Sequence, residues 1–515
     1  MIRKDLILVW HHHFYWIRRC VTLLSKSVKP HIVQDIAVPQ IIRLGGISIP
    51  EYREEAYHIV LSIDLGNTTT ACVIVGTNLA SGLTYIIDKK VWMIHSIRPP
   101  KKGEEIFGKS LDGTILSRNA VEEHIRDIIK ATLKESKIDP SKDLDYLVHT
   151  TGLVGQWESD KHINSYLGCL SKGCMDAGIP PSKMRPPMSK DKLPSDDSQF
   201  SLMDRVMYDG AVAGTIPATG LSGRVMIAND MEGDLSLAGI KQGALSTPVD
   251  FRNPCVGIDF GTIIDGRFTE AVPKGRDDPY ARTTGCIIGL GGAIADALTR
   301  GTGEVDPIIG TAREFFGDNI ISGYFSKKES KRIRNYVDSV HELIKVEEVA
   351  HNHTHVGLVP IDPSIAENMK IKIFGVDAGE NFNGHDALME IGMEVFRKEG
   401  RKGFTELVDR VMSRTALRLI RVAAEKKVFT GDMAIGFSGR AIMSGRKPEY
   451  VLEGVINSEQ YRDPVDRMVF VSSALPRGAA LMARCMSGLG NPKKPIGGCR
   501  GEACILGRRK RFQNM

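Results

Sequence analysis

The sequence predicts an α/β protein with two lobes, mixed sheets covered by helices, and a duplicated core. Residues 58–76 and 255–270 each consist of an apolar run, a turn with Asp and Gly, and a second apolar run, which is typical of a hairpin. The echo between IDLGNTTT and IDFGTIID is what a duplicated fold with one hairpin in each lobe would produce. Apolar residues at helical spacing over residues 114–137 and 404–427 predict amphipathic helices beside the strands.

The composition excludes several classes of protein. The chain has 515 residues, 42% hydrophobic and 25% charged, which is enough apolar material for two or more cores. Its net charge of +6 is small for this length and gives no reason to expect a nucleic-acid partner. Nine cysteines are too few for a disulfide scaffold, and no apolar run approaches the roughly 20 residues of a membrane span. We therefore expect a cytoplasmic protein with reduced thiols and no membrane partner.

Changes of pattern along the chain predict four segments. Residues 1–28 form an extension outside the core, because their apolar part is broken by His and Arg and fits a signal peptide poorly. Residues 29–220 form the first lobe, with an extended lead-in to the hairpin and a Pro-rich insertion between residues 169 and 201. Residues 221–488 form the second lobe, and residues 489–515 form a tail containing Cys and Arg.

The turn of the first hairpin predicts a phosphate-binding loop. Asp64 ends the first strand, and Gly66 lets the backbone turn closely. Four polar residues then offer hydrogen-bond donors to a phosphate chain: Asn67, Thr68, Thr69 and Thr70. Asp64 would hold Mg²⁺ through water, because this hard cation keeps much of its hydration shell. The alternative is a hairpin whose turn is only incidentally rich in threonine, although Asp-Leu-Gly-Asn-Thr-Thr-Thr is more specific than a lone Gly-rich turn.

This hairpin resembles the first phosphate loop of the superfamily of actin, sugar kinases and the seventy-kilodalton heat-shock chaperones. The resemblance implies a two-lobed actin-like ATPase (ribonuclease H-like) fold, with ATP as the ligand and a three-stranded meander opening the first sheet. It also makes Thr150 and Thr151 candidates near the γ-phosphate, against the alternative of an ordinary strand-to-loop turn. The reaction stays open, because this fold serves kinases, chaperones, filaments and activators of redox enzymes.

Two stretches compete as the second phosphate loop. One is residues 225–239, in which Asp230 lies among acidic residues and Gly. The other is residues 255–270, in which Asp259, Gly261 and Thr262 repeat the turn of the first hairpin. An Asp in this loop would orient or deprotonate the water or hydroxyl that attacks the γ-phosphate. The sequence leaves the choice between Asp230 and Asp259 open.

Two small-residue turns complete the predicted site. Gly291 and Gly292 open a helix whose N-terminal amides would favour an anion, and the stretch resembles a loop in the ATPase domain of reductive activators of corrinoid proteins. In DMAIGFSGRAIMSG, the superfamily resemblance implies that Gly436, Ser438 and Gly439 lie against the adenosine.

Cysteines and histidines provide two weaker metal candidates. Equal spacing within two cysteine pairs would suit zinc or an iron–sulfur cluster if the fold joined them, with incidental cysteines as the alternative: Cys169, Cys174, Cys499 and Cys504. Three alternating histidines in a predicted strand would share one face, with ordinary surface histidines as the alternative: His351, His353 and His355.

At whole-chain level the sequence resembles the methanogenesis marker protein 14 family of archaea, from about Lys29 to the end. The resemblance rests on IDLGNTTTACVIVG, HTTGLVG, IDFGTIIDGR, LGGAIADAL and CILGRRK. It implies a cytoplasmic protein of methanogens that binds and hydrolyses ATP to activate or maintain a methanogenesis enzyme, with that enzyme or an activation factor as partner. The alternatives are a nucleotide-binding assembly subunit without hydrolysis and a small-molecule kinase. The oligomeric state is left open by the sequence, with a homodimer as one possibility.

Overall fold

The computed structural model describes most of the two predicted lobes. The described residues are 30–33, 57–78, 84–110, 113–150, 155–157, 160–184, 188–189, 207–208, 230–271, 283–300, 302, 331–350, 352–357, 359–361, 366–367, 370–458, 461 and 464–486. The extension before residue 30 and the tail after residue 486 lie outside them.

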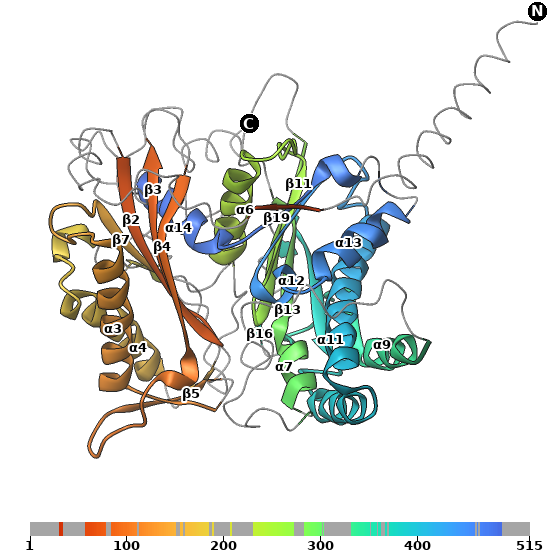
Figure 1. The fold of residues 1–515 in the computed structure, drawn as a ribbon, viewed down its shortest axis with the longest axis horizontal. Coiled ribbons are helices and arrows are strands. Elements are labelled where there is room, and N and C mark those ends of the chain that lie inside the picture. The colour runs from red at the N-terminus through yellow and green to blue at the C-terminus, as the bar shows by residue number, and fades with distance from the viewer. Residues whose placement is uncertain are drawn as a thin grey trace, which may run out of the picture.

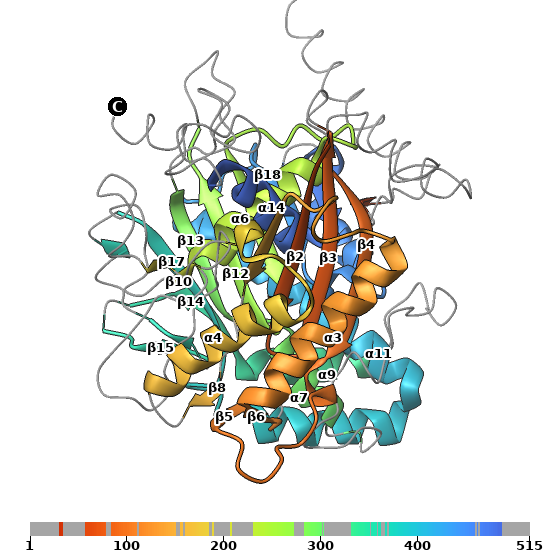
Figure 2. The ribbon, with the colours of Figure 1, turned by 90° about the vertical axis from the view of Figure 1, so that its left-hand side faces the viewer.

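The first lobe is built on a four-stranded sheet in the order β4-β3-β2-β7. Strands β2 (Tyr57–Leu65), β3 (Thr69–Asn78) and β4 (Thr84–Met93) form an antiparallel meander, and β7 (Tyr146–Thr150) is parallel to β2. Helices α3 (Arg118–Ser136) and α4 (Asp160–Asp176) cover its outer face (Figures 1 and 2). A small sheet lies beside them, with order β6 (Ile115–Ser117), β5 (Ile106–Ser110) and β8 (Gly155–Trp157).

The second lobe is built on an eight-stranded sheet in the order β1-β19-β18-β11-β12-β13-β17-β14. Its strands are β1 (His31–Val33), β19 (Met468–Val471), β18 (Ala434–Ser438), β11 (Cys255–Phe260), β12 (Ile263–Thr269), β13 (Thr283–Leu290), β17 (Lys372–Ala378) and β14 (Ile344–Glu348). Strands β11, β12 and β13 form an antiparallel meander, and β18 is parallel to β11. This repeats the pattern of β2, β3, β4 and β7, so the predicted α/β class, meander and duplicated core are confirmed.

Short elements connect the two sheets and their helices. They are η1 (Ile94–Ser96), η2 (Pro181–Lys183), β9 (Met188–Ser189), β10 (Met207–Tyr208), β15 (His355–Val356), β16 (Val359–Pro360) and η4 (Pro464–Arg467).

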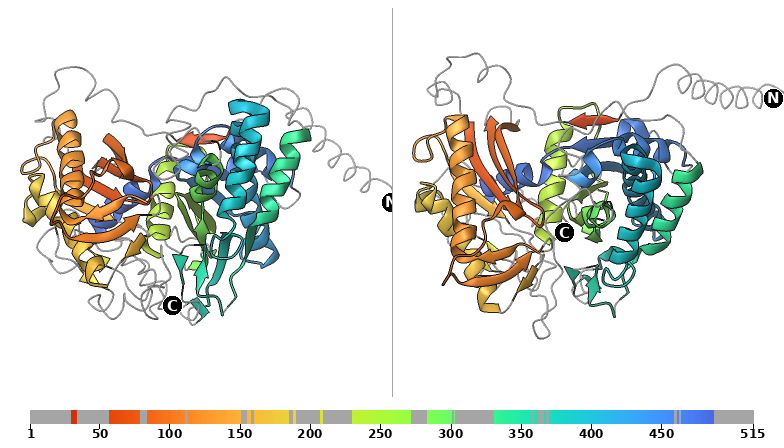
Figure 3. Two further views of the ribbon diagram at one scale, coloured as in Figure 1. Left: turned by 90° about the horizontal axis from the view of Figure 1, so that it is seen from below. Right: turned by 60° about the horizontal axis from the view of Figure 1, so that its bottom comes forward.

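Helices cover both faces of the second sheet. On the outer face lie α7 (Gly292–Arg300), α9 (Lys331–Leu343), α11 (His385–Glu425), α12 (Arg440–Met443) and α13 (Lys447–Ile456). On the inner face lie α6 (Asp230–Ala244) and α14 (Ala474–Met486), between the two sheets (Figures 1 and 3). Strand β11 alternates accordingly, because Val256 and Ile258 belong to the outer core while Cys255 packs with α6.

Four expectations about the fold differ from the structure. The Pro-rich insertion was expected from Cys169 onward, but helix α4 continues through this residue to Asp176. Strand β1 was expected in the lead-in to the first hairpin, but it pairs with β19 in the second sheet. Residues 230–244 form helix α6, so the proposed hairpin at residues 225–239 is wrong. The acidic residues of this stretch lie at the start of the helix. The small residues after them allow another helix to pack closely. The expected histidine strand is also wrong, because β14 ends at Glu348 and only His355 of the three lies in a described strand.

Helices α6 and α14 cross with their backbones in contact. A Cβ atom added to Gly239 would lie 1.8 Å from the carbonyl oxygen of Ala474, and one added to Gly478 would lie 1.7 Å from that of Leu235. Helix α6 packs on the second sheet, while α14 also packs on β2 and β7 of the first. Two glycines therefore make possible the contact that joins the lobes.

We expect Gly239→Ala to destabilise the protein by more than about 2 kcal/mol, because a backbone contact cannot move aside as a flexible side chain can. The free energy of unfolding in urea measures this. The control is Gly168→Ala at an exposed position of α4, where an added Cβ meets no atom within 4 Å. That variant should be unchanged or more stable by about 0.5–1 kcal/mol. Equal stability of the Gly239 variant and wild type would contradict the packing described.

Beneath the first hairpin, a buried histidine supports strand β3. His124 of α3 is 6% exposed, and its Nε2 lies 2.9 Å from the hydroxyl of Thr70. The ring of Trp92 contacts the imidazole edge to face, with centroids 5.6 Å apart. Burial lowers the pKa of His124 to about 4, so the imidazole is neutral at physiological pH.

The stability of the protein should therefore depend on His124 between pH 6.5 and pH 4. In this range the unfolded chain protonates a histidine with the ordinary pKa of 6.5 and the folded protein does not, so the free energy of unfolding falls as pH falls. We expect His124→Gln, whose amide can bond Thr70, to remove up to about 3 kcal/mol of this dependence. Urea unfolding at several pH values measures it. Parallel profiles for variant and wild type would show that His124 is not the group responsible.

Candidate functional site

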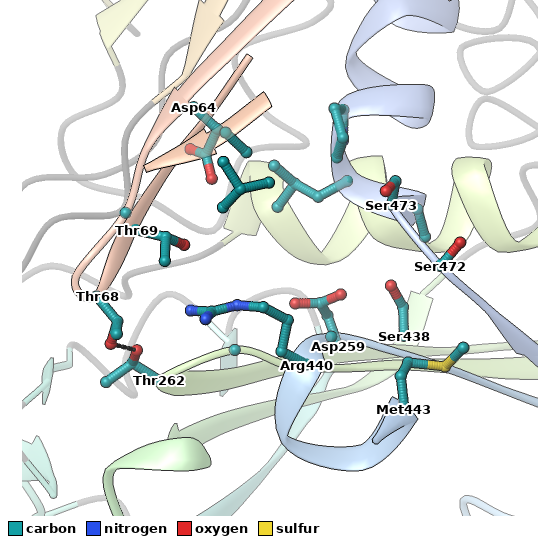
Figure 4. Close-up of a pocket in the computed structure, with 18 of the residues that line it drawn as sticks. Asp64, Thr68, Thr69, Asp259, Thr262, Ser438, Arg440, Met443, Ser472 and Ser473 are labelled. Atoms are coloured by element: carbon teal, nitrogen blue, oxygen red, sulfur yellow. Dashed lines mark hydrogen bonds between the residues drawn. The ribbon is translucent and has the colours of Figure 1, made fainter. Parts of the chain in front are cut away.

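A cavity of about 550 Å³ lies between the two lobes, where their central hairpins face each other (Figure 4). The first lobe lines it from hairpin β2–β3 and from β4, and the second from hairpin β11–β12, from the turn after β18 and from the turn between β19 and α14. The polar and charged residues of the lining are Asp64, Asn67, Thr68, Thr69, Lys89, Asp259, Thr262, Asp265, Ser438, Arg440, Ser472 and Ser473.

The first hairpin presents its turn to this cavity, as its sequence predicted. The amide of Gly66 donates to the carbonyl oxygen of Thr69 at 3.0 Å and closes the turn, while Asp64 at the end of β2 lines the cavity. Thr70 differs from the expectation, because it is fully buried on the opposite face of β3 and bonds His124. Side chains alternate across a strand, so Thr69 and Ala71 line the cavity and Thr70 does not.

The second hairpin is β11–β12, and it places Asp259 where the first places Asp64. Asp64 is the register partner of Thr150 on the neighbouring parallel strand, and Asp259 is the partner of Ser438. Each Asp comes one residue before the end of its strand and two before the glycine of the turn, Gly66 or Gly261. Of the two candidate second loops, the structure forms a hairpin only at residues 255–270.

Burial makes the carboxyl of Asp259 a weaker acid than an exposed aspartate. The residue is 8% exposed, and burial raises the pKa of its carboxyl to about 6, although a hydrogen bond with Ser438 and the charge of Arg440 act in the opposite direction. A carboxyl with this pKa can accept or release a proton near neutral pH.

The tips of the two hairpins touch. The hydroxyls of Thr68 and Thr262 form a hydrogen bond between the lobes (Figure 4). The polar donors predicted on the two turns therefore lie on opposite walls of one narrow space.

Sequence reasoning missed Asp265. It is the antiparallel register partner of Asp259, lines the cavity and is 2% exposed. Directly paired residues on one face of a sheet have Cβ atoms about 4.5–5.5 Å apart, so the second hairpin carries two neighbouring carboxyls. The first hairpin has Ala71 at this position. The second Asp of IDFGTIID was visible in the sequence, but the register that places it opposite the first was not.

The glycines before α7 support the second hairpin from behind. The amide of Gly291 donates to the carbonyl oxygen of Thr262 at 3.0 Å, and that of Gly292 to the carbonyl oxygen of Gly261 at 2.7 Å. Neither glycine lines the cavity. Their expected role as direct anion donors therefore does not fit, because the turn of the hairpin already occupies these amides.

Of the three residues predicted to contact adenosine at the end of β18, two line the cavity and one does not. Ser438 and Gly439 line the cavity, and Gly439 has φ +87°, with an added Cβ only 2.3 Å from the backbone of Phe260. Gly436 is not part of the cavity lining. It faces helix α6, where an added Cβ would lie 2.2 Å from the side chain of Ile240. Its small size serves the packing of α6 on the sheet.

Two cationic side chains of the cavity were also missed. Lys89 on β4 donates from Nζ to the hydroxyl of Ser473 at 2.8 Å, which links the first lobe to the start of α14. Arg440 follows Gly439, and its guanidinium extends between the two hairpins (Figure 4). No local motif marks either residue, since each reaches the cavity through the arrangement of distant strands.

The remaining candidates lie away from the cavity or outside the described residues. Asp230 is the first residue of α6, but its side chain is outside the described part. Cys169 and Cys174 are buried in the core of the first lobe, and burial raises the pKa of the Cys169 thiol far above its usual range. Cys499 and Cys504 also lie outside the described residues. Among those that are described, no three His, Cys, Asp or Glu side chains are placed to hold a metal ion directly.

Thr150 is the last residue of β7 and the register partner of Asp64. The side chain of Thr150 and the whole of Thr151 lie outside the described residues. In the described ranges no helix combines the length and the apolar character needed to cross a membrane.

Several solved structures show limited similarity. A reductive activator for a corrinoid, iron–sulfur protein is 10% identical, with a TM-score of 0.30, over 83% of this chain and 60% of that one. The ethanolamine utilization protein EutJ from Carboxydothermus hydrogenoformans is 9% identical, with a TM-score of 0.30, over 83% and 90%. A Ppx/GppA phosphatase from Aquifex aeolicus is 13% identical, with a TM-score of 0.26, over 56% and 64%. All three TM-scores are below 0.5.

Sequence relatives are much closer. A protein from Methanothermobacter thermautotrophicus is 42% identical over 463 residues, which cover 90% of this chain and 84% of the relative. One from Methanocaldococcus jannaschii is 39% identical over 467 residues, which cover 91% and 93%. Both organisms are methanogens, and both proteins are described as uncharacterized. The model of the family described as "Uncharacterized protein conserved in archaea (DUF2114)" matches residues 57–513, and the chain belongs to this family.

Proposed function

We propose that this protein binds Mg²⁺-ATP between its lobes and hydrolyses it to drive a change in a partner protein of methanogens. One observation carries the proposal. Two hairpins with equivalent register, one from each lobe, meet at their tips over a cavity that holds a carboxylate from each hairpin at the same position.

The walls of the cavity suit a phosphate chain and its metal ion. The turns at Gly66 and Gly261 bring backbone amides and threonine hydroxyls to both sides of the space. The acidic side chains of the lining are Asp64, Asp259 and Asp265. Their carboxylate oxygens are the kind of ligand that Mg²⁺ prefers. Asp64 would hold the ion largely through water.

The wall of the cavity that Ser438, Gly439 and Met443 form suits a nucleoside. Ser438 and Gly439 present small side chains, and Met443 adds an apolar contact surface. A planar base can approach backbone closely only where side chains are small. This supports the adenosine position implied by the sequence, with Gly436 acting one layer deeper.

Hydrolysis in this site requires a proton acceptor and charge neutralisation. A water oxygen would attack the γ-phosphorus, the bond from this phosphorus to the β–γ bridging oxygen would break, and ADP and phosphate would leave. Asp259, with its pKa raised to about 6, is the proposed acceptor of the water proton. Asp230 stays a second proposed acceptor. Mg²⁺ would supply charge neutralisation when bound, and Lys89 and Arg440 add positive charge to the lining.

The proposed partner is a methanogenesis enzyme or an activation factor. The proposal is supported by membership of an archaeal family with close relatives in two methanogens, and by the resemblance of the sequence to methanogenesis marker protein 14. A partner that binds the ATP form better must tighten ATP binding by the same factor.

ATP with Mg²⁺ should raise the melting temperature of the protein, because a ligand selective for the native state stabilises it. We expect Asp64→Asn to reduce this shift by more than half, since one carboxylate of the ion site is lost. Asp127→Asn, on the exposed side of α3, is the matched control and should keep the shift. Differential scanning fluorimetry measures both. A full shift in the Asp64 variant would remove Asp64 from the site, and no shift in wild type would remove ATP as the ligand.

Asp259→Asn should retain the ATP-dependent shift and lose about a hundredfold in phosphate release, the low end of what proton transfer contributes. Phosphate release is measured from purified protein alone and with methanogen extract, which should accelerate it. Unchanged release in the variant would transfer the acceptor role elsewhere, with Asp230→Asn as the next variant. Phosphate recovered on a small metabolite would indicate a kinase, and no release with or without extract would indicate a binding subunit.

A further inference from the structure

We infer that Arg440 recognises the terminal phosphate of the nucleotide, so that the site distinguishes a nucleoside triphosphate from a diphosphate. The inference rests on the proposed function and adds a residue that no sequence motif marks. It follows from where Arg440 points, how its segment is held, and what else lines that part of the cavity.

Arg440 points into the space between the hairpin tips. In Figure 4 its guanidinium lies beyond Asp259, on the side of Thr68, Thr69 and Thr262. These threonines belong to the two turns that would carry the phosphate chain. Ser438 and Met443, which would contact the nucleoside, lie on the other side of the Arg440 backbone. Its cationic group is thus placed toward the far end of a phosphate chain rather than toward the base.

The segment that carries Arg440 is held at its start. Gly439 has φ +87° and presses on the backbone of Phe260 so closely that no side chain fits there. The position of Arg440 is therefore set by direct backbone contact with β11, the strand that also carries Asp259.

The segment is also held at its end by a buried ion pair. Lys447 and Asp409 are 3% and 1% exposed, with Nζ and Oδ1 2.6 Å apart. The other oxygen of Asp409 accepts from the amide of Arg446 at 2.9 Å, and Lys447 also donates to the carbonyl oxygen of Ser444 at 3.2 Å. A side chain mounted on a segment fixed at both ends loses less freedom when it binds a ligand.

The chemistry of the side chain fits the terminal phosphate. A guanidinium presents several N–H donors in one plane and binds phosphate oxygens in pairs. The neighbouring carboxylates Asp64, Asp259 and Asp265 repel an anion unless a metal ion offsets their charge, so a fixed cation favours the more highly charged triphosphate. The other described cation of the cavity, Lys89, is the register partner of Val73, four residues along β3 from Thr69, and it donates to Ser473 just before α14.

The test compares ATP with ADP, both with Mg²⁺, by isothermal titration calorimetry on full-length protein. Variants are Arg440→Gln, Arg440→Lys and, as a matched control, Arg421→Gln, whose side chain on α11 is 60% exposed and outside the cavity. We expect Arg440→Gln to weaken ATP at least tenfold and ADP less than threefold, with Arg440→Lys intermediate. The control should bind both as wild type does, and all variants should melt at the wild-type temperature without nucleotide.

Three outcomes would overturn the inference. Equal weakening of ATP and ADP would show that Arg440 acts through Asp259 or through the shared phosphates. Unchanged binding of both would show that it does not contact the nucleotide. If wild-type protein binds neither nucleotide, the proposed function itself fails, and this result differs from the other two because it is seen before any substitution. Inorganic tripolyphosphate, titrated in parallel, should follow ATP in its dependence on Arg440.

Discussion

The backbone contact between α6 and α14 is the constraint on which the site depends. At Gly239 and Gly478 the two helices approach as closely as their main chains allow. Because α6 packs on the second sheet and α14 on both α6 and the first sheet, this crossing sets the distance and angle between the lobes. At this separation the hairpin tips meet, and the hydroxyls of Thr68 and Thr262 form a hydrogen bond. The cavity is therefore a consequence of helix packing that lies outside its own lining.

The two lobes share a plan but divide the chemistry unequally. Both place an Asp before a Gly-containing turn, and both pair this Asp with a hydroxyl residue of the neighbouring parallel strand. The second lobe adds Asp265 where the first has Ala71, and it adds Arg440 after the strand that pairs with the Asp. A duplicated scaffold thus presents one simple wall and one wall with most of the ionisable groups.

Several described glycines near the cavity serve the packing of the fold. Gly291 and Gly292 allow the start of α7 to meet the second hairpin, and Gly436 allows α6 to meet β18. Their amides and surfaces are already in use within the fold. Gly439 combines both uses, because its backbone contact with Phe260 also directs the following arginine into the cavity. A Gly-rich turn is therefore a weak indicator of a ligand until its amides have been accounted for.

The sequence by itself determined the local features of this protein, because turn chemistry and side-chain periodicity act over a few neighbouring residues. It predicted the α/β class, the two equivalent hairpins, and residues such as Asp64, Asp259 and Ser438 that line the cavity. Only the tertiary structure decided which face each side chain uses and which distant segments meet. Strand register pairs Asp265 with Asp259, and Thr70 lies on the face of β3 that contacts His124. Strand β1 pairs with β19 and so belongs to the second sheet. These choices depend on contacts between segments far apart in the chain, which no local pattern records.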